Sequence, residues 1–454
     1  MQLLDKVNTV TEHVRVYFKS FQKNIDLLAN HILVIIAFFL SINVSVLHDG
    51  FQILLILFLL KPNKLELLIK VFNNRVVMSF VLFVVMNYVW ILVSDDQVAS
   101  YSAAKSMKFF LFSMLVYAFA QYRFVNRILA AFVLGVVVSA AFSYALSFQL
   151  IEPNFLYSNE RVATYENPSP FVWHIDFGFI LVFSSILLIQ RLSIIRSQRK
   201  FLLISILFIF LSLCLFLNIA RSGYILYGLG LLLFFVVHYR KNAFKLFPVI
   251  FLLISLLSSI AYTSLPIVEK RVNTLVNSVE KMYYDNNYKS SVGMRLKEYE
   301  QAYILFLDKP LLGYGTGMHV KTMYKDAVEK KIFYANSIKN YCTTDSQYFD
   351  ILLQFGLIGL FVFLNIFYQV YKNEQNDTQL KEIQILFIIL YLMFSLQSPS
   401  TTKDLLSYIF FFILTLTTVR RANNDFFLDP LSIKQFLFYT FFGINAFLLA
   451  PYIL

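Results

Sequence analysis

Long apolar blocks constrain this chain more strongly than any other feature of its sequence. Hydrophobic residues make up 58% of the 454 residues and charged residues only 15%, against about half and about a quarter in soluble domains. Most blocks are long enough, or nearly so, to cross a hydrocarbon core about 30 Å thick. We therefore expect an all-α polytopic membrane protein with about 12–13 transmembrane helices. The blocks lie near residues 28–47, 51–60, 76–94, 106–121, 128–149, 171–190, 201–219, 222–238, 246–263, 347–371, 383–398, 404–419 and 435–453.

Basic residues set the orientation of these helices. The formal net charge of +12 would suit nucleic-acid binding, but its distribution has another explanation. With the N-terminus inside, Lys and Arg gather in the inner loops, as in the run from Arg191 to Lys200. This positive-inside pattern is typical of membrane proteins, so we expect membrane lipids and no nucleic acid as partners. The short outer loops hold far fewer basic residues: Lys105, Arg161, Arg221 and Lys403.

The alternation of inner and outer loops along the chain indicates four parts. Residues 1–27 carry apolar residues at helical spacing between basic ones, which indicates an amphipathic helix, interfacial or cytoplasmic. Residues 28–263 form an N-terminal transmembrane bundle, and residues 347–454 the C-terminal transmembrane helices. Between them, residues 264–346 form one long polar insertion on the outer side, large enough to fold as a small helical cap.

Arg221 is the sharpest polar candidate near the membrane. It lies in FLNIARSGYILYGLG, in a very tight outer turn between two apolar blocks. An ionisable residue at membrane depth is costly and is a functional candidate by default. Because a planar guanidinium donates paired hydrogen bonds to phosphate, Arg221 could be an anion clamp at the outer membrane surface. The alternative is an interfacial arginine that extends to lipid headgroups.

The insertion contains an ordered polar stretch, SVGMRLKEYEQAYILFLDKPLLGYGTGMH, residues 291–319. Arg295 begins an apparent amphipathic helix that continues through Tyr299 and Phe306. A positive charge in the first turn of a helix interacts unfavourably with the helix dipole. We therefore expect Arg295 to have an anionic partner; the alternative is a solvated surface residue. Pro310 ends the helix, and the glycines after it permit a turn.

Asp345 lies just outside the apolar run that starts near residue 347. A carboxylate there could act as a general base toward a hydroxyl at the membrane surface. It could equally cap the following helix, because Asp and Ser are common residues before such a run. Asp350, one turn further on, is a second candidate, with simple solvation as its alternative.

Weaker signals come from two other outer segments. Arg161 lies in the loop before the block at 171–190, and Lys108 enters an earlier block from outside, where it could add positive charge to a cavity. The chain has no zinc-protease, phosphate-loop, paired-cysteine or serine-hydrolase motif. Its two cysteines, Cys214 and Cys342, provide neither a disulfide framework nor a metal set. We expect no metal and no cofactor.

Three stretches, in this order around one large outer loop, resemble the O-antigen ligase family and its polymerase relatives. They are NIARSGYILYGLGLL, SVGMRLKEYEQAYILFLDKPLLGYGTG and DSQYFDILLQFGLIGLF. The resemblance is strongest over residues 215–362. It implies a metal-independent, inverting membrane glycosyltransferase with a GT-C-like fold, in the bacterial inner membrane, whose active site faces the periplasm.

The resemblance also implies the reactants. Such enzymes take a glycan from an undecaprenyl diphosphate carrier; ligases pass it to lipid A-core, and polymerases pass it to another carrier-linked repeat unit. The two arginines that the family associates with the carrier diphosphate match Arg221 and Arg295. A family lysine corresponds to Lys108, and Arg161 could help to bind the diphosphate.

One position departs from the family pattern. Where the ligases carry a histidine assigned to activating the acceptor hydroxyl, this chain has Asp345 followed by Ser346. An aspartate is a weaker base at neutral pH unless burial raises its pKa. His319 could supply an imidazole for the substrate instead, or be a solvated loop residue. We expect an O-antigen ligase, with a repeat-unit polymerase, a protein O-oligosaccharyltransferase and a polysaccharide transporter as alternatives.

Overall fold

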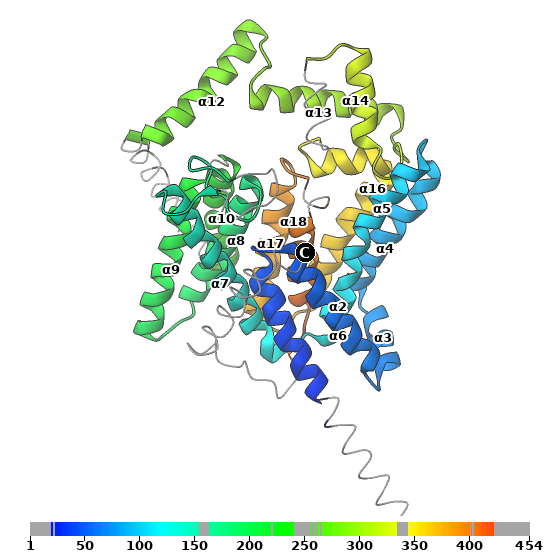
Figure 1. The fold of residues 1–454 in the computed structure, drawn as a ribbon, viewed down its shortest axis with the longest axis vertical. Helices are drawn as coiled ribbons and strands as arrows, with labels where there is room; N and C mark the ends of the chain where they lie inside the picture. The colour runs from blue at the N-terminus through cyan, green and yellow to red at the C-terminus, as the bar shows by residue number, and fades with distance from the viewer. Residues whose placement is uncertain are drawn as a thin grey trace, which may run out of the picture.

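The computed structural model describes residues 20, 23–153, 163–218, 221–239, 255, 259, 262–263, 266–333, 344–399, 401 and 404–421 (Figure 1). Over these residues the chain forms α-helices and short 3-10 helices and no strand, which confirms the predicted all-α fold. Most of the amphipathic segment predicted for residues 1–27 lies outside the described residues, as do Arg161 and the last apolar block.

Six of the described helices are long and apolar enough to cross a membrane, which confirms a multi-pass membrane protein. The pair α2 (Val44–Leu60) and α3 (Lys64–Phe72), bent by 119°, adds a seventh if it is counted as one span. The six are α4 with η1 (Arg75–Val89 and Trp90–Val93), α7 (Tyr122–Ser147), α8 (His174–Leu192), α9 (Gln198–Leu217), α10 (Arg221–Tyr239) and α16 (Gln347–Lys372).

The other predicted apolar blocks form shorter elements or fall outside the described residues. A block at 106–121, expected as one span, is divided between a 3-10 helix and an α-helix. The blocks at 246–263 and 435–453 lie largely or wholly outside the described part. The shorter elements are α5 (Gln97–Ser106), η2 (Met107–Leu111), α6 (Phe112–Phe119), α17 (Thr378–Phe394) and α18 (Asp404–Leu416).

Aromatic side chains fill the centre of the bundle. α8 is the central helix of the bundle, because 78% of its apolar membrane-spanning stretch is buried inside the protein. Only 17% of the corresponding stretch of α9 is buried. Tyr391 of α17 stacks on Phe410 of α18 with ring centroids 4.3 Å apart, and Phe179 of α8 meets Tyr391 edge-on at 5.9 Å. Lipid tails are as apolar as these rings, so close van der Waals packing, rather than exclusion from water, holds such helices together.

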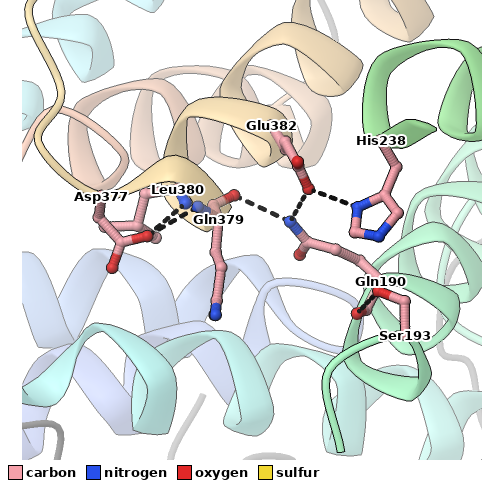
Figure 2. A network of polar contacts seen from close by, with 7 residues as sticks. All are labelled: Gln190, Ser193, His238, Asp377, Gln379, Leu380 and Glu382. Atoms are coloured by element: carbon pink, nitrogen blue, oxygen red, sulfur yellow. Dashed lines mark hydrogen bonds and ion pairs between the residues drawn. The ribbon is translucent and has the colours of Figure 1, made fainter. Parts of the chain in front are cut away.

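A polar network fixes the register between α10 and α17 at one end of the bundle. Figure 2 shows His238 near the end of α10 facing Glu382 near the start of α17, with Nδ1 and Oε2 3.0 Å apart. Gln190 of α8 donates from Nε2 to the same carboxylate at 3.3 Å and to the carbonyl oxygen of Gln379 at 2.9 Å. Since the end of one helix meets the start of the other, α10 and α17 are antiparallel.

Three polar helices form a cap at the other end of the bundle (Figure 1). α13 confirms the helix predicted around Arg295, and the hydroxyl of its N-cap residue, Ser290, accepts a hydrogen bond of 3.1 Å from Gly293 N. The cap meets the bundle where α13 packs on α16 and the Tyr299 hydroxyl of α13 donates to the carbonyl oxygen of Leu396 after α17, at 3.1 Å. Its helices are α12 (Pro266–Asp285), α13 (Ser291–Asp308) and α14 (His319–Glu329).

The membrane helix α16 bends where the cap docks on it. Gly356 has a φ of +63°, a left-handed conformation that favours glycine, and it divides α16 into a short first part and a longer second part. The glycine turn that the sequence predicts after Pro310 lies against this bend. Three backbone hydrogen bonds join the two: Tyr314 N to Leu353 O at 2.8 Å, Gly315 N to Gln354 O at 2.9 Å, and Leu357 N to Pro310 O at 2.9 Å.

Candidate active site

The structure pairs two of the predicted site residues at the junction of the cap and the membrane helices. Arg295, in the second turn of α13, donates from Nε to Asp345 Oδ2 at 2.9 Å. The two side chains are 29% and 34% exposed, so water and solutes reach the pair. Asp345 has a φ of +53°, a left-handed conformation that aspartate tolerates better than most residues. The anionic partner expected for Arg295 is therefore present within the chain itself.

Asp345 does not cap the helix that follows it, so that alternative is wrong. Ser346 occupies the N-cap position of α16, and no side chain there makes a capping hydrogen bond. Tyr299, one turn after Arg295, places its hydroxyl 3.1 Å from the carbonyl oxygens of both Asp345 and Leu396. Burial raises the pKa of Tyr299 to about 12, so the hydroxyl stays protonated and available as a donor. One cap side chain thus holds the start of α16 beside the segment after α17.

A second pair, fully buried, joins α14 to α16. Asp350 is 0% exposed, and its Oδ1 accepts hydrogen bonds from Thr344 N at 3.1 Å and Thr344 Oγ1 at 2.7 Å. His319, the first residue of α14, is 5% exposed and has Nε2 3.6 Å from the same oxygen. Solvated positions for His319 and Asp350 are therefore wrong. Burial lowers the pKa of His319, against a smaller opposite effect of Asp350, so the imidazole is neutral at neutral pH.

Glu298 belongs to the same cluster, and the sequence reasoning missed it. It follows Arg295 by three residues, so the two lie on one face of α13, and it is only 7% exposed. Burial, chiefly, and the charges of Asp345 and Asp350 raise the pKa of Glu298 to about 7, although Arg295 acts in the opposite direction. Glu298 could have been identified from its position three residues after Arg295, because the sequence does predict the helix that carries both residues.

The other predicted cations are not joined to this cluster by any contact among the described residues. Lys108, in η2, is exposed, and its Nζ lies 5.7 Å from the centroid of the Phe109 ring. It lies on the cap side of the bundle, because α5 just before it contacts the turn after Pro310: a Cβ on Gly317 would lie 2.4 Å from Ala103 Cβ. Arg161 lies outside the described residues.

The structure describes the backbone of Arg221, at the first position of α10, and not its side chain. The point where a Cβ on Gly230 would be lies 3.2 Å from Leu390 Cδ2 of α17. Because α10 and α17 are antiparallel, the start of α10, where Arg221 lies, is at the end of the bundle where α17 ends at Phe394. Two residues past that end, the carbonyl oxygen of Leu396 accepts a hydrogen bond from Tyr299 of the cap. Arg221 thus lies on the same side of the bundle as the Arg295–Asp345 pair.

The residue that caps the end of α9 is anchored to α8. Asn218, which is 0% exposed, donates from Nδ2 to the carbonyl oxygen of His174 at 2.8 Å. Its own carbonyl oxygen accepts a hydrogen bond of 2.6 Å from the Tyr224 hydroxyl. These contacts hold the residue after α9 to α8 and to the first turn of α10.

The cluster combines a cation with proton acceptors at one surface. Arg295 can bind an anion, while Asp345, exposed beside it, can accept a proton from a hydroxyl. Glu298 and the His319–Asp350 pair are buried next to these two groups. Among the described residues, no three His, Cys, Asp or Glu side chains stand close enough together to hold a metal ion.

Two comparisons with known proteins bear on this site. Residues 206–364 match a family model described as O-antigen ligase, which confirms the resemblance noted over residues 215–362. The match contains Arg221, Arg295 and Asp345. An uncharacterized protein of Haemophilus influenzae is 25% identical over 281 residues, which are 59% of this chain and 65% of that protein. The aligned part thus spans less than two thirds of the relative's length.

Proposed function

We propose, from the O-antigen ligase family match of residues 206–364, that this membrane protein is a glycosyltransferase that moves a glycan from an undecaprenyl diphosphate carrier to an acceptor hydroxyl. The reaction takes place at the periplasmic face of the inner membrane. Lipid A-core is the acceptor proposed first, which makes the protein an O-antigen ligase. Another carrier-linked repeat unit, the acceptor of a polymerase, is the second. The Arg295–Asp345 pair carries the proposal, because it lies inside the matched region at the junction of cap and membrane helices.

Arg295 suits the diphosphate of the donor. A guanidinium has five N–H donors, and among the described residues Arg295 uses only Nε–H, which bonds to Asp345. Diphosphate oxygens can accept the remaining donors in paired geometry. Because about a third of each side chain of the pair is exposed, a diphosphate competes directly with Asp345 for the guanidinium.

Further cations complete the proposed donor site. Arg221 begins α10 on the cap side of the bundle, and we assign it to the same diphosphate. Lys108 and Arg161 are proposed as additional positive charges for the donor. His319 is 5% exposed, so we place it beneath the substrates, where it supports Asp350 and the first part of α16.

The proposed reaction is a single displacement. The acceptor hydroxyl oxygen attacks the anomeric carbon from the side opposite the diphosphate, and the bond between that carbon and the diphosphate oxygen breaks, so the configuration inverts. The proton of the hydroxyl passes to the carboxylate of Asp345. The negative charge that develops on the leaving undecaprenyl diphosphate is stabilised by Arg295 and Arg221. No covalent enzyme intermediate is required.

The test is glycan transfer in a deletion strain complemented with variants. Arg295→Ala and Arg221→Ala should each abolish transfer at unchanged protein level in the membrane. Normal transfer by both well-expressed variants would overturn the proposal. The glycan profile of the deletion strain separates the two acceptors: carrier-linked polymer that accumulates without reaching lipid A-core indicates a ligase, and single-repeat glycans indicate a polymerase.

A further inference from the structure

A cavity of about 710 Å³ lies at the end of the bundle opposite the cap. It is lined by α3, the start of α4, α6, the end of α16 and the segment after α18. α16 begins at the cap and runs away from it (Figure 1). α4 runs toward the cap, because Trp90, just after its end, donates from Nε1 to the carbonyl oxygen of Leu312 in the cap turn at 2.7 Å. The cavity is therefore separate from the candidate active site.

The lining of this cavity is positively charged. Two carboxylates line it, Glu66 and Glu374, against four cations, which leaves a formal charge of +2. Arg75 occupies the first position of α4, where a positive charge interacts unfavourably with the helix dipole. An anion in the cavity would be attracted both by this guanidinium and by the start of the helix. The four cations are Lys70 of α3, Arg75 of α4, Lys372 of α16 and Arg420 after α18.

Three of these cations have no carboxylate partner within the described part of the chain. Arg420 Nη2 lies 3.8 Å from Glu374 Oε2. Lys70, Arg75 and Lys372 form no ion pair with any described side chain, although two carboxylates line the same cavity. Their charges are therefore available to a ligand.

A buried amide adds a hydrogen-bond donor to these charges. Asn373, the residue that follows α16, lines the cavity, and its Nδ2 is buried without a hydrogen-bond partner among the described residues. A buried donor that lacks an acceptor costs free energy, so the amide favours a ligand that supplies one. Cations together with an amide donor are the groups that bind phosphate oxygens.

An apolar stripe on α3 indicates that the phosphate belongs to a lipid. Leu65, Ile69 and Phe72 follow one another at spacings of four and three residues, so they lie on one face of the helix, and all three are exposed. Ile69 also lines the cavity, so this stripe begins at the rim of the charged site. A short amphipathic helix of this kind lies in the membrane interface, at the depth of the lipid headgroups.

We propose that the cavity binds an anionic phospholipid, whose phosphate accepts hydrogen bonds from Arg75, Lys372 and Asn373 and whose acyl chains lie along the apolar stripe of α3. A headgroup that carries the phosphate as its only charge, such as that of phosphatidylglycerol, fits the positive lining better than a zwitterionic headgroup, whose ammonium would meet the same cations. The site is independent of the proposed function.

Basic residues are common at one face of a membrane protein, so the experiment must separate a built site from general attraction to charge. Lipids bound to the full-length protein are counted by native mass spectrometry in a neutral detergent, which has no charged surface of its own. The probes are phosphatidylglycerol and phosphatidylcholine with the same acyl chains. The wild type should bind one phosphatidylglycerol at least about tenfold more tightly than phosphatidylcholine. Equal binding of the two lipids would overturn the proposal, as would displacement of phosphatidylglycerol by an equal concentration of inorganic phosphate, which would indicate a site for a soluble anion.

The double variant Arg75→Ala with Lys372→Ala should weaken phosphatidylglycerol binding by roughly tenfold or more. The matched control is Arg199→Ala with Lys200→Ala. These two exposed cations stand in the first turn of α9, which ends on the cap side just before α10 and therefore begins at the same end of the bundle as the cavity, outside its lining. The control should bind as wild type, and an equal loss in both double variants would overturn the proposal.

Asn373→Leu removes the buried donor without changing any charge. It should weaken phosphatidylglycerol binding by about fivefold, the effect of losing one hydrogen bond, whereas attraction to charge alone predicts no change. Unchanged binding by a folded Asn373→Leu protein would overturn the proposal. The unfolding midpoint without added lipid checks that each variant is folded; if Asn373→Leu is not, the exposed positions of the Arg75 and Lys372 double variant still provide the test.

Discussion

Arg295 and Asp345 are fifty residues apart in the sequence, yet Nε of the first lies 2.9 Å from Oδ2 of the second. The bond joins a helix of the cap to the residue that precedes a membrane helix, so it unites the two parts of the chain at the proposed reaction centre. A diphosphate at Arg295 and a hydroxyl at Asp345 would therefore lie side by side. This relationship gives the first two predictions.

Arg295→Ala should lower the rate of glycan transfer by roughly 100- to 1000-fold, the usual effect of removing one preorganised donor to a developing negative charge. Arg295→Lys should recover only part of this loss, because an ammonium group lacks the planar fork that binds phosphate in pairs. Initial rates with purified protein provide the measurement. Lys297→Ala, on the same helix in an exposed ion pair, is the control and should stay near wild type.

Asp345→Asn should lower kcat by roughly 100- to 10,000-fold, because an amide cannot accept the hydroxyl proton. His319→Gln should leave kcat within about tenfold of wild type, since the imidazole is buried and supports Asp350 instead of contacting the substrates. A severe loss of kcat in His319→Gln, with normal rates in Asp345→Asn, would reverse the assignment of the proton acceptor.

Glu298→Gln should stabilise the protein at high pH. The pKa of Glu298 is raised from 4.5 to about 7 in the folded state, so its contribution to stability is complete below pH 4.5 and is lost as pH rises through 7. The wild type therefore pays for a buried charge above pH 7, by roughly 1–3 kcal/mol. Thermal unfolding in detergent should show a higher midpoint for Glu298→Gln at pH 8 and no difference below about pH 4. A difference that does not vary with pH would contradict the assignment.

Gly356→Ala should prevent the cap from docking on α16. A Cβ at this position would lie 2.3 Å from the carbonyl carbon of Leu311, and the φ of +63° is unfavourable for alanine. The left-handed conformation alone costs about 1–2 kcal/mol, and the contact with backbone atoms adds to it. Gly228→Ala in α10 is the matched control: no atom lies within 4 Å of its Cβ, so the change should be neutral or stabilising. Protease sensitivity of the cap distinguishes the two variants.

The parts of this molecule that could be read from the sequence are those set by local pattern. Apolar blocks predict membrane helices, and the Arg295 helix with its proline stop follows from spacing and capping chemistry. The bend of α16 was not predicted, because nothing in the apolar run around Gly356 distinguishes this glycine from others in membrane helices. The bend depends on the contact with the turn after Pro310, which is distant in the sequence.

The candidate site divides in the same way. The sequence predicted Arg295 and Asp345 as separate site residues, from their charge and position. Their pairing depends on the packing of the cap helix α13 against the start of α16. The burial of Glu298 and His319 depends on packing between α13, α14 and α16, which spacing along one helix does not reveal. Sequence patterns therefore identified the exposed pair and left the buried groups beside it uninterpreted.

Three of the hydrogen bonds that dock the cap turn on α16 join main-chain atoms, and a fourth runs from Gly317 N to the side-chain Oε1 of Gln354 at 2.7 Å. Leu311 and Leu312, within that turn, are 61% and 48% exposed, so their side chains contribute little to this docking. Related proteins should therefore diverge freely at these two positions while they keep small residues where the two backbones touch, at Gly313 and Gly356. Distant relatives would then be recognisable less by the residues that face solvent than by the spacing of their glycines.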